Sequence, residues 1–354
     1  MSHPKRILVA PLDWGLGHAT RCVPLIRRFK DEGHVVLLAA GGHSEKFLRQ
    51  EFPDLTIIPK KGYGIQYSLK TSMTLMMLFQ SLKILMNIFR EHQWLKKIIQ
   101  QHKIDEVVSD NCYGLWNKNV HSIFITHQLM IKCPAGLKWM EPLLHRIVIW
   151  FVSRYNECWI PDVEGEDNLS GDLSHRYPVP GNAKFIGWCS RFALQENKLT
   201  TENEYDLCIL ISGPEPHRSV FESESIEALK TFRGNAILIL GKPGNEILPE
   251  LKENVRVFNH LETNELQSVL INSKKIICRS GYSTIMDLRT INKGALLIPT
   301  PGQTEQEYLA EYLDEKNGFE MLKANETLSG KIQEYVKANS VKRELPEETI
   351  ISAY

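Results

Sequence analysis

The chain has 354 residues, which is more than one hydrophobic core usually supports, so we expect two domains. Its 42 Lys and Arg residues balance its 42 Asp and Glu residues, and this zero net charge disfavours nucleic acid as a partner. With 43% hydrophobic and 24% charged residues, the composition is that of a globular protein and argues against a disordered chain.

The sequence does not show the cysteine spacing, signal peptide or long apolar segment that is typical of secreted and membrane-spanning proteins. The seven cysteines form no Cys-x-x-Cys pair and lie mostly in apolar runs, which predicts reduced, buried thiols. The apolar run Ile7–Ala10 is too short for the core of a signal peptide. Polar residues interrupt the stretch Thr74–Phe89, which falls short of the roughly 20 apolar residues of a spanning helix. We therefore expect a cytoplasmic protein with no transmembrane segment.

Short apolar runs rich in β-branched residues alternate with longer amphipathic stretches in both halves of the chain. The predicted strands are Ile7–Ala10, Val35–Ala39, Thr56–Ile58, Glu106–Ser109 and Ile123–Thr126 in the first half, and Leu207–Ile211, Ala236–Leu240, Val255–Phe258, Lys275–Cys278 and Ala295–Ile298 in the second. This alternation predicts an α/β fold with two doubly wound parallel sheets in tandem.

The domain boundary is expected within Pro161–Glu204, a stretch rich in turn-forming and polar residues. The predicted division is residues 1–190 for the first domain, 200–327 for the second, and 328–354 for a C-terminal helix and tail. Within that last part, Lys331–Ala338 is the predicted closing helix, because no turn-forming residue interrupts it.

The loop Pro11–Arg21 follows the first predicted strand and leads into a predicted helix over Val23–Lys30. Gly15 and Gly17 let its backbone turn tightly and approach a ligand, and a helix N-terminus favours an anion. His18 follows the second glycine and the third glycine of a dinucleotide-binding motif is missing, which disfavours a nicotinamide cofactor. A structural turn capped by His18 is the alternative interpretation.

A second loop, residues 278–287, also joins a predicted strand to a predicted helix. Gly281 and the hydroxyls of Ser283 and Thr284 offer donors to phosphate oxygens. Asp287 follows one helical turn later and could accept hydrogen bonds from ribose hydroxyls. The alternative is a serine cap with a carboxylate that complements the helix dipole.

Two further loops carry polar side chains. After the last predicted strand, amides and a carboxylate suit sugar hydroxyls, which need paired donors and acceptors. They are Gln303, Gln306 and Glu307. The loop that opens the second half offers a small turn and one cation for a diphosphate. Its residues are Ser212, Gly213 and Arg218.

The combination of motifs resembles glycosyltransferase family 28. The runs Arg279–Asp287, Gly294–Pro299 and Gln306–Tyr308 are similar to its C-terminal nucleotide-sugar domain, while Gly15–His18 and Thr126–Gln128 are similar to motifs of its N-terminal domain. The resemblance implies a GT-B fold, in which two Rossmann-like domains face each other across a cleft. It also implies that the sugar nucleotide binds the C-terminal domain.

The resemblance implies binding roles on both sides of that cleft. The acceptor-binding residues it implies are Gly15, Gly17, Asp110, His127 and Gln128. The donor-binding residues are Arg191, Ser212, Gly213, Arg218, Phe258, Asn259, Ser280, Gly281, Ser283, Thr284, Asp287, Gln303, Gln306 and Glu307. Among these, Ser212, Ser283 and Thr284 would contact the diphosphate. Asp287 would contact the ribose, Gln306 and Glu307 the donor sugar, and the backbone at Phe258 and Asn259 the uracil.

An inverting transferase needs a base for the acceptor hydroxyl and groups that stabilise the departing diphosphate. His18 is the first candidate for the base because its ordinary pKa leaves it partly neutral at pH 7. Asp13 is the second candidate, and Asp110 also competes. The chain has no Asp-x-Asp motif, so we expect no metal and no cofactor besides the UDP-sugar co-substrate.

Apolar residues recur at helical spacing over Leu75–Phe89, with lysines and arginines among and after them. A basic amphipathic helix within residues 71–100 would suit an anionic membrane surface and a lipid-linked acceptor. The alternative is that this stripe packs against the first sheet or lines an acceptor groove. Trp139–Trp150 allows the same two interpretations. The first interpretation implies a cytoplasmic protein with peripheral contact to the inner face of the membrane, and the second implies a cytoplasmic protein without it.

The predicted function is an inverting, metal-independent transfer of a hexose or N-acetylhexosamine from a UDP-sugar to a glycan or lipid-linked acceptor. Because one fold serves several activities, two alternatives stay open. One is a nucleotide-sugar epimerase that uses carboxylates such as Asp13, Asp110 and Glu307. The other is a non-catalytic protein that binds nucleotide sugars.

Overall fold

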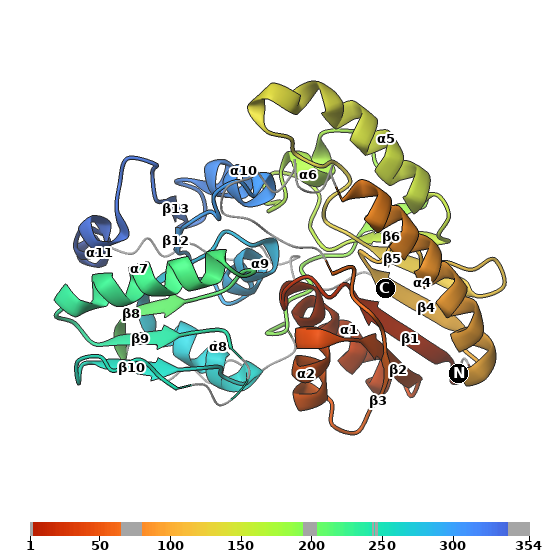
Figure 1. Ribbon diagram of the computed structural model, residues 1–354, viewed down its shortest axis with the longest axis horizontal. Helices are drawn as coiled ribbons and strands as arrows, with labels where there is room; N and C mark the ends of the chain where they lie inside the picture. Colours follow the sequence, from red (N-terminus) through yellow and green to blue (C-terminus); the bar gives the residue numbers. More distant parts are fainter. Residues whose placement is uncertain (1–2, 65–79, 194–203, 243, 245–246, 339–354) are drawn as a thin grey trace.

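The computed structural model describes residues 3–64, 80–193, 204–242, 244 and 247–338. These residues form two parallel β-sheets, each in its own α/β domain (Figure 1). The predicted fold class of two doubly wound domains is therefore confirmed. Among the described residues, no helix is long and apolar enough to cross a bilayer.

The first sheet has the strand order β3-β2-β1-β4-β5-β6-β7, and every neighbouring pair is parallel. Its strands are β1 (Arg6–Pro11), β2 (Val35–Ala40), β3 (Thr56–Pro59), β4 (Glu106–Asp110), β5 (His121–Ile125), β6 (Glu157–Ile160) and β7 (Ala183–Phe185). The accompanying helices are α1 (Gly17–Asp31), α2 (Gly42–Glu51), α4 (Ser81–His102), α5 (Glu141–Val152), α6 (Asp172–His175) and the 3-10 helix η1 (Ala135–Met140).

Alternating side chains of β1 show why this sheet is buried on both faces. Ile7 and Val9 pack into a core with α1 and α2, while Leu8 and Ala10 pack into another with α4. All four side chains are 0–1% exposed. A parallel strand covered on both sides requires such a continuous apolar run, which is the pattern that the sequence presents.

The second sheet has the order β10-β9-β8-β11-β12-β13 and is also parallel throughout. Its strands are β8 (Tyr205–Leu210), β9 (Ala236–Ile239), β10 (Val255–Phe258), β11 (Ser273–Cys278), β12 (Leu296–Leu297) and β13 (Glu320–Met321). Its helices are α7 (His217–Thr231), α8 (Thr263–Ile271), α9 (Tyr282–Thr290), α10 (Thr304–Leu313) and α11 (Leu328–Lys337). The last of these, α11, packs against α7 and β11.

The two domains meet where loops leave the carboxyl ends of their strands. The first turn of α1 follows β1, the first turn of α9 follows β11, and these two helices are in contact (Figure 1). Tyr282 OH also donates to Pro161 O at 2.7 Å, which joins α9 to the end of β6. In parallel α/β domains, ligands bind at this edge of the sheet.

The ten predicted strands coincide with observed strands to within two residues at each end. Three short strands were missed, namely β6, β7 and β13. The helix predicted from Val23 begins at Gly17 instead, and the closing helix begins at Leu328 instead of Lys331. The first sheet ends at Phe185 and the second begins at Tyr205. The predicted tail after Ala338 lies outside the described residues.

Candidate active site

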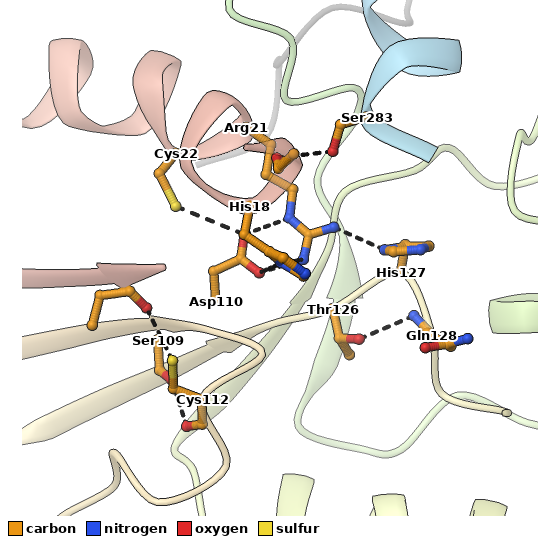
Figure 2. Close-up of polar contacts among 12 residues, drawn as sticks. His18, Arg21, Cys22, Ser109, Asp110, Cys112, Thr126, His127, Gln128 and Ser283 are labelled. Carbon is orange, nitrogen blue, oxygen red and sulfur yellow. Dashed lines mark hydrogen bonds and ion pairs between the residues drawn. The ribbon is translucent and has the colours of Figure 1, made fainter. Parts of the chain in front are cut away.

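The glycine loop between β1 and α1 lies against the second domain. Gly15 has a φ of +76°, a conformation that residues with a side chain rarely adopt. A Cβ atom on Gly17 would lie 3.0 Å from Ser283 Oγ, and this hydroxyl donates to Gly17 O at 2.9 Å (Figure 2). The glycines therefore allow the turn and the close approach of α1 to α9.

His18, on the first turn of α1, contacts Asp110 at the carboxyl end of β4 (Figure 2). His18 Nδ1 lies 2.8 Å from Asp110 Oδ1. Arg21, three residues after His18, binds both carboxylate oxygens of Asp110 through Nε and Nη2. Arg21 and Asp110 are 2% and 0% exposed, so water does not screen their ion pair.

The electrostatics of this cluster favour a neutral His18. Burial and the Arg21 guanidinium lower the pKa of His18 below its usual 6.5, against the opposite effect of Asp110. Burial alone would raise the pKa of Asp110, but Arg21 and His18 lower it to about 2. At pH 7, Asp110 is therefore a carboxylate and His18 an imidazole that can accept a proton.

His127 follows β5 by two residues and connects this cluster to the second domain. Its Nδ1 lies 2.8 Å from Arg21 Nη1, and its Nε2 lies 2.9 Å from Glu305 Oε1. The His127 ring stacks on Tyr282, with centroids 4.0 Å apart and planes 5° apart. Burial would raise the pKa of Glu305, but His127 and the neighbouring His18 and Arg21 lower it. Glu305 is thus a carboxylate at neutral pH.

The structure brings together three predicted residues that are far apart in the sequence: His18 on the first turn of α1, Asp110 at the end of β4 and His127 just after β5. Arg21 and Glu305 belong to the same network, and neither was predicted from the sequence as a site residue. Arg21 could have been predicted from the sequence, because it follows His18 by three residues and residues at that spacing on a helix share one helix face. Glu305 had a weaker one, as a carboxylate between the predicted Gln303 and Gln306.

Gln128, predicted to bind the acceptor, lies directly after His127 and is half-buried. Its backbone N–H donates to Thr126 Oγ1 at 3.0 Å (Figure 2). This bond fixes the backbone of the turn that carries His127.

The carboxylate of Asp13, the second candidate base, lies against the first turn of α2. Its Oδ1 accepts a hydrogen bond from Ser44 N at 3.4 Å. A Cβ atom on Gly42 would lie 2.5 Å from Asp13 Oδ2. A carboxylate in this place complements the N-terminus of α2. A catalytic role for Asp13 stays a prediction, and these contacts favour helix capping.

The predicted diphosphate-binding residues of the second loop lie at the N-terminus of α9. Gly281 is its N-cap, and Ser283 and Thr284 belong to its first turn. Backbone N–H groups in a first turn lack helical partners, and together with the helix dipole they attract anions. Ser280 Oγ donates to Gln306 O at 2.8 Å, which joins this loop to α10.

Ser212 and Gly213 follow β8 in the same sheet. Gly213 has a φ of +111°, and no atom lies within 4 Å of the position of a Cβ there. Arg218, predicted to meet the diphosphate, is paired instead with two carboxylates of its own helix region. It contacts Glu215 through Nη2 and Glu222 through Nη1, the latter at 2.7 Å. Diphosphate contact by Arg218 stays a prediction.

Asp287, the predicted ribose ligand, is 4% exposed and joined to the segment between the domains. Its Oδ1 accepts from Ser190 Oγ at 2.7 Å, and its Oδ2 accepts from Arg191 Nε at 3.0 Å. Burial raises the pKa of Asp287, against the opposite effect of Arg191. A ribose would share this carboxylate with Arg191, so ribose binding stays a prediction.

The predicted sugar-binding loop before α10 is held by its own side chains. Gln306 Oε1 accepts from Thr300 N at 2.9 Å, and Glu307 Oε1 accepts from Gly302 N at 2.7 Å. Gln303 is the N-cap residue of α10. These bonds give the loop a fixed shape at the domain boundary, next to Glu305.

A pocket of about 220 Å³ lies between α2 of the first domain and the start of α8 of the second. Its lining includes Arg27, Phe47, His260 and Thr263. Phe258, at the end of β10, is 38% exposed, and Asn259 follows it. The backbone predicted to bind uracil therefore lies two residues or fewer from a residue that lines this pocket.

Within the described parts of the chain, no three His, Cys, Asp or Glu side chains gather in a way that could hold a metal ion. All seven cysteines are buried and free of disulfides, as their apolar surroundings in the sequence predicted.

Two parallel α/β domains that meet at the carboxyl ends of their strands define the GT-B class of fold. A solved structure with the same arrangement, the glycosyltransferase of kitacinnamycin, has a TM-score of 0.63 at 14% identity. The similarity covers 95% of this chain and 90% of that one.

Sequence comparisons narrow the class. Residues 225–351 match the glycosyltransferase family 28 C-terminal domain. An uncharacterized glycosyltransferase of Methanosarcina acetivorans is 25% identical over 335 residues, which cover 88% of this chain and 81% of the relative. The UDP-N-acetylglucosamine–N-acetylmuramyl-(pentapeptide) pyrophosphoryl-undecaprenol N-acetylglucosamine transferase of Idiomarina loihiensis is 24% identical over 173 residues, 46% of this chain and 47% of that enzyme. Together these findings support a GT-B glycosyltransferase similar to family 28, as the sequence motifs implied.

Proposed function

We propose that the chain is an inverting glycosyltransferase in which His18 deprotonates the acceptor. The observation that carries this proposal is the pair of His18 and Asp110, a neutral imidazole held by a buried carboxylate at the domain boundary. When His18 Nδ1 donates to Asp110, its Nε2 is free to accept a proton. Asp110 then stabilises the imidazolium that forms.

The proposed donor is a UDP-hexose or UDP-N-acetylhexosamine, and the acceptor is a glycan or a lipid-linked saccharide. In the transfer, the acceptor oxygen bonds to the anomeric carbon while the bond from that carbon to the diphosphate oxygen breaks. The electron pair of the broken bond leaves with UDP, and the acceptor proton passes to His18 Nε2. A single displacement of this kind inverts the anomeric configuration.

The negative charge of the departing diphosphate would meet the N-terminus of α9. The backbone N–H groups at this end and the Thr284 hydroxyl supply donors and a favourable dipole, whereas the Ser283 hydroxyl would have to give up its bond to Gly17 O to donate to the diphosphate. The sequence has no Asp-x-Asp motif. On these grounds we propose that transfer proceeds without a metal ion.

The contacts of three carboxylates favour transfer over epimerisation. An epimerase needs carboxylates that are free to act around the sugar. Here Asp110 is bound by Arg21, Glu307 by Gly302 N, and Asp13 lies against α2. The neutral, held imidazole of His18 likewise favours an enzyme over a protein that only binds nucleotide sugars.

Acceptor-dependent release of UDP tests this function. The purified protein is incubated in EDTA with UDP-hexoses or UDP-N-acetylhexosamines, with and without polyprenyl-diphosphate-linked saccharides. We expect UDP release with an acceptor and a product whose anomeric configuration, measured by NMR couplings, is opposite to that of the donor. A retained configuration contradicts the mechanism, and a 2-epimer formed without acceptor supports the epimerase instead.

Two helical segments of the first domain expose large apolar side chains. They are Leu82, Leu85, Met86 and Phe89 of α4, and Trp139, Leu143, Ile147 and Trp150 of η1 and α5. Phe89 is 64% exposed and Trp139 is 72% exposed. Packing against the first domain, the alternative interpretation of this stripe, holds for Ile84 and Ile88 but not for these residues. Residues 71–79 of the predicted helix lie outside the described residues.

We propose that these exposed faces contact the cytoplasmic side of an anionic membrane, which brings the site close to a lipid-linked acceptor. Both α4 and α5 lie on the outer side of the first domain (Figure 1). Trp116 connects them, because its ring packs at a tilt against His92 of α4, with centroids 4.4 Å apart, and lies 5.1 Å from the guanidinium of Arg154, which follows α5. Exposed cations accompany the apolar residues, as anionic lipid headgroups require. They are Lys83, Arg90, Lys138, Arg146 and Arg154.

Phe89→Glu should weaken binding to vesicles of phosphatidylcholine and phosphatidylglycerol by at least about tenfold, since one buried aromatic side chain contributes roughly 1.5–3 kcal/mol. Co-sedimentation with vesicles measures the effect. Gln101→Glu, an exposed position near the end of α4, adds the same charge without removing an apolar group and serves as the control. Equal binding by the wild type and Phe89→Glu contradicts membrane contact through this face.

A further inference from the structure

Glu305 of the second domain contacts the cluster of His18, Arg21, Asp110 and His127, and the proposed transfer step assigns no role to Glu305. It lies on the first turn of α10 and contacts His127 Nε2 at 2.9 Å. The groups that face His127 are Arg21 from α1, Tyr282 from α9 and Glu305 from α10. Two of these three residues belong to the second domain, so the surroundings of His127 are complete only when the domains are together.

The chemistry of arginine fixes the protonation of His127. A guanidinium can only donate hydrogen bonds, so His127 Nδ1, 2.8 Å from Arg21 Nη1, must be the unprotonated acceptor. The proton of the neutral ring is then on Nε2, where it donates to the Glu305 carboxylate. Glu305 therefore stabilises the one tautomer of His127 that accepts from Arg21.

Arg21 matters in turn because two groups compete for His18 Nδ1. Asp110 Oδ1 lies 2.8 Å away and can only accept, while Arg21 Nη2 lies 2.9 Å away and can only donate. Donation from Nδ1 to Asp110 leaves Nε2 free to act as a base. Acceptance from Arg21 puts the ring proton on Nε2, where the base is needed, and abolishes that role.

We propose that Glu305 is a positioning residue that makes His18 a base only when the second domain is in place. Through the fixed tautomer of His127, it holds one Arg21 nitrogen at His127, so that His18 Nδ1 keeps its bond to Asp110. Without Glu305, His127 loses this preference and no longer holds Arg21 Nη1, and Nη2, which already lies 2.9 Å from His18 Nδ1, donates to it. This inference rests on the proposed function of His18 and adds a coupling between domain contact and proton acceptance.

Other contacts of α10 hold the domains together independently of Glu305. Thr304 Oγ1 donates to Lys132 O at 2.7 Å, and Tyr308 OH accepts from Asp172 N at 2.6 Å. Tyr308→Phe removes one hydrogen bond between the domains on the same helix without touching His127. It is therefore a matched control for a loss of interface alone.

The kinetic test compares Glu305→Ala, Glu305→Gln and Tyr308→Phe in the UDP-release assay. Glu305→Ala should lower kcat roughly 10- to 100-fold, as misplaced catalytic groups do, with the KM for UDP-sugar within about twofold. The amide oxygen of Glu305→Gln still accepts from His127, so this variant should recover kcat to within about threefold of the wild type. Tyr308→Phe should match the wild type.

Three kinetic results overturn the proposal. A raised donor KM with normal kcat in Glu305→Ala would make Glu305 a direct ligand of the donor. Failure of Glu305→Gln to recover kcat would mean that the charge, not the hydrogen bond, is required. An equal loss in Tyr308→Phe would reduce the effect to contact between the domains.

NMR of the full chain with ¹⁵N-labelled histidines separates this proposal from the proposed function, because it needs no turnover. His127→Gln assigns the His127 signals, and His18→Ala assigns those of His18. We expect His127 protonated on Nε2 and His18 on Nδ1 in the wild type and in Glu305→Gln. In Glu305→Ala, the His18 proton should move to Nε2. Unchanged tautomers of both rings in Glu305→Ala refute the coupling, whereas absent transfer with the expected tautomers refutes only the proposed function.

Discussion

Replacing His18 with alanine should lower kcat by roughly 10²- to 10⁴-fold, the usual contribution of a general base. UDP binding should stay unchanged, because His18 lies on the acceptor domain while the predicted nucleotide contacts are in the second domain. In the wild type, kcat/KM should rise with pH through the pKa of His18, which burial and Arg21 place below 6.5. The variant should lose this limb of the profile. Initial rates of UDP release and calorimetric titration with UDP measure both quantities.

His34→Ala is a suitable control, because this histidine follows the far end of α1 and contacts Lys5 N. It should retain the activity and pH profile of the wild type. An active His18→Ala variant with an unaltered pH profile would show that another group is the base.

Asp110→Asn should lower the free energy of unfolding by about 3–5 kcal/mol, the usual effect of removing one partner from a buried ion pair. Arg21 and Asp110 are 2% and 0% exposed, so bulk solvent does not screen the guanidinium left without its partner. The variant should also lose activity, since His18 Nδ1 no longer has a carboxylate to accept its proton. Urea unfolding and initial rates measure the two effects.

An ion pair at the C-terminal end of α1, the helix that carries Arg21, serves as the exposed comparison for the buried pair of Arg21 and Asp110. Arg28 and Glu32 lie 2.8 Å apart with side chains 33% and 42% exposed. Glu32→Gln should change stability by less than about 1 kcal/mol, as exposed ion pairs do. Similar losses of unfolding free energy in Asp110→Asn and Glu32→Gln would contradict a larger contribution from the buried Asp110 ion pair.

The stability difference between wild type and Asp110→Asn should also depend on pH. The folded pKa of Asp110 is about 2, below its ordinary 3.8, so its contribution to stability is present above pH 3.8 and is lost as the pH falls through about 2. The difference should therefore shrink over this interval in acid unfolding curves. A difference that stays constant down to pH 2 contradicts a paired carboxylate.

The sequence predicted ten strands of the two sheets but missed β6 and β7 at one side of the first sheet and β13 at one edge of the second. Runs such as Leu207–Ile211 are continuously apolar, because their strands are buried on both faces. β7 has three residues and β13 has two, and charged residues interrupt both, whereas the equally short β12 lies in a continuous apolar run. α1 begins at Gly17 because contact with the second domain fixes the glycine loop, and no local apolar pattern marks that start.

For the site, the sequence supplied single residues but not their network. His18 was identified from its glycine loop and Asp110 as a competing base, yet they are 92 residues apart. The contact of His127 with Glu305 joins residues 178 apart and depends on how the two domains meet, which no local motif encodes. Asp287 is a further example, since its place on the helix was predicted but its hydrogen bonds to Ser190 and Arg191 were not.

Calorimetric titration in EDTA with UDP-, GDP-, dTDP- and CMP-linked sugars tests the metal-free donor site on the second domain, on which the proposed transfer depends. We predict that a UDP-sugar is the one donor of this set that binds. In an unfolding measurement, a hundredfold excess of it over its Kd should stabilise the folded state by about 2.7 kcal/mol. His18→Ala should bind the same sugar equally well. If no nucleotide sugar binds, or if binding requires a divalent metal, the proposed metal-free donor site is contradicted.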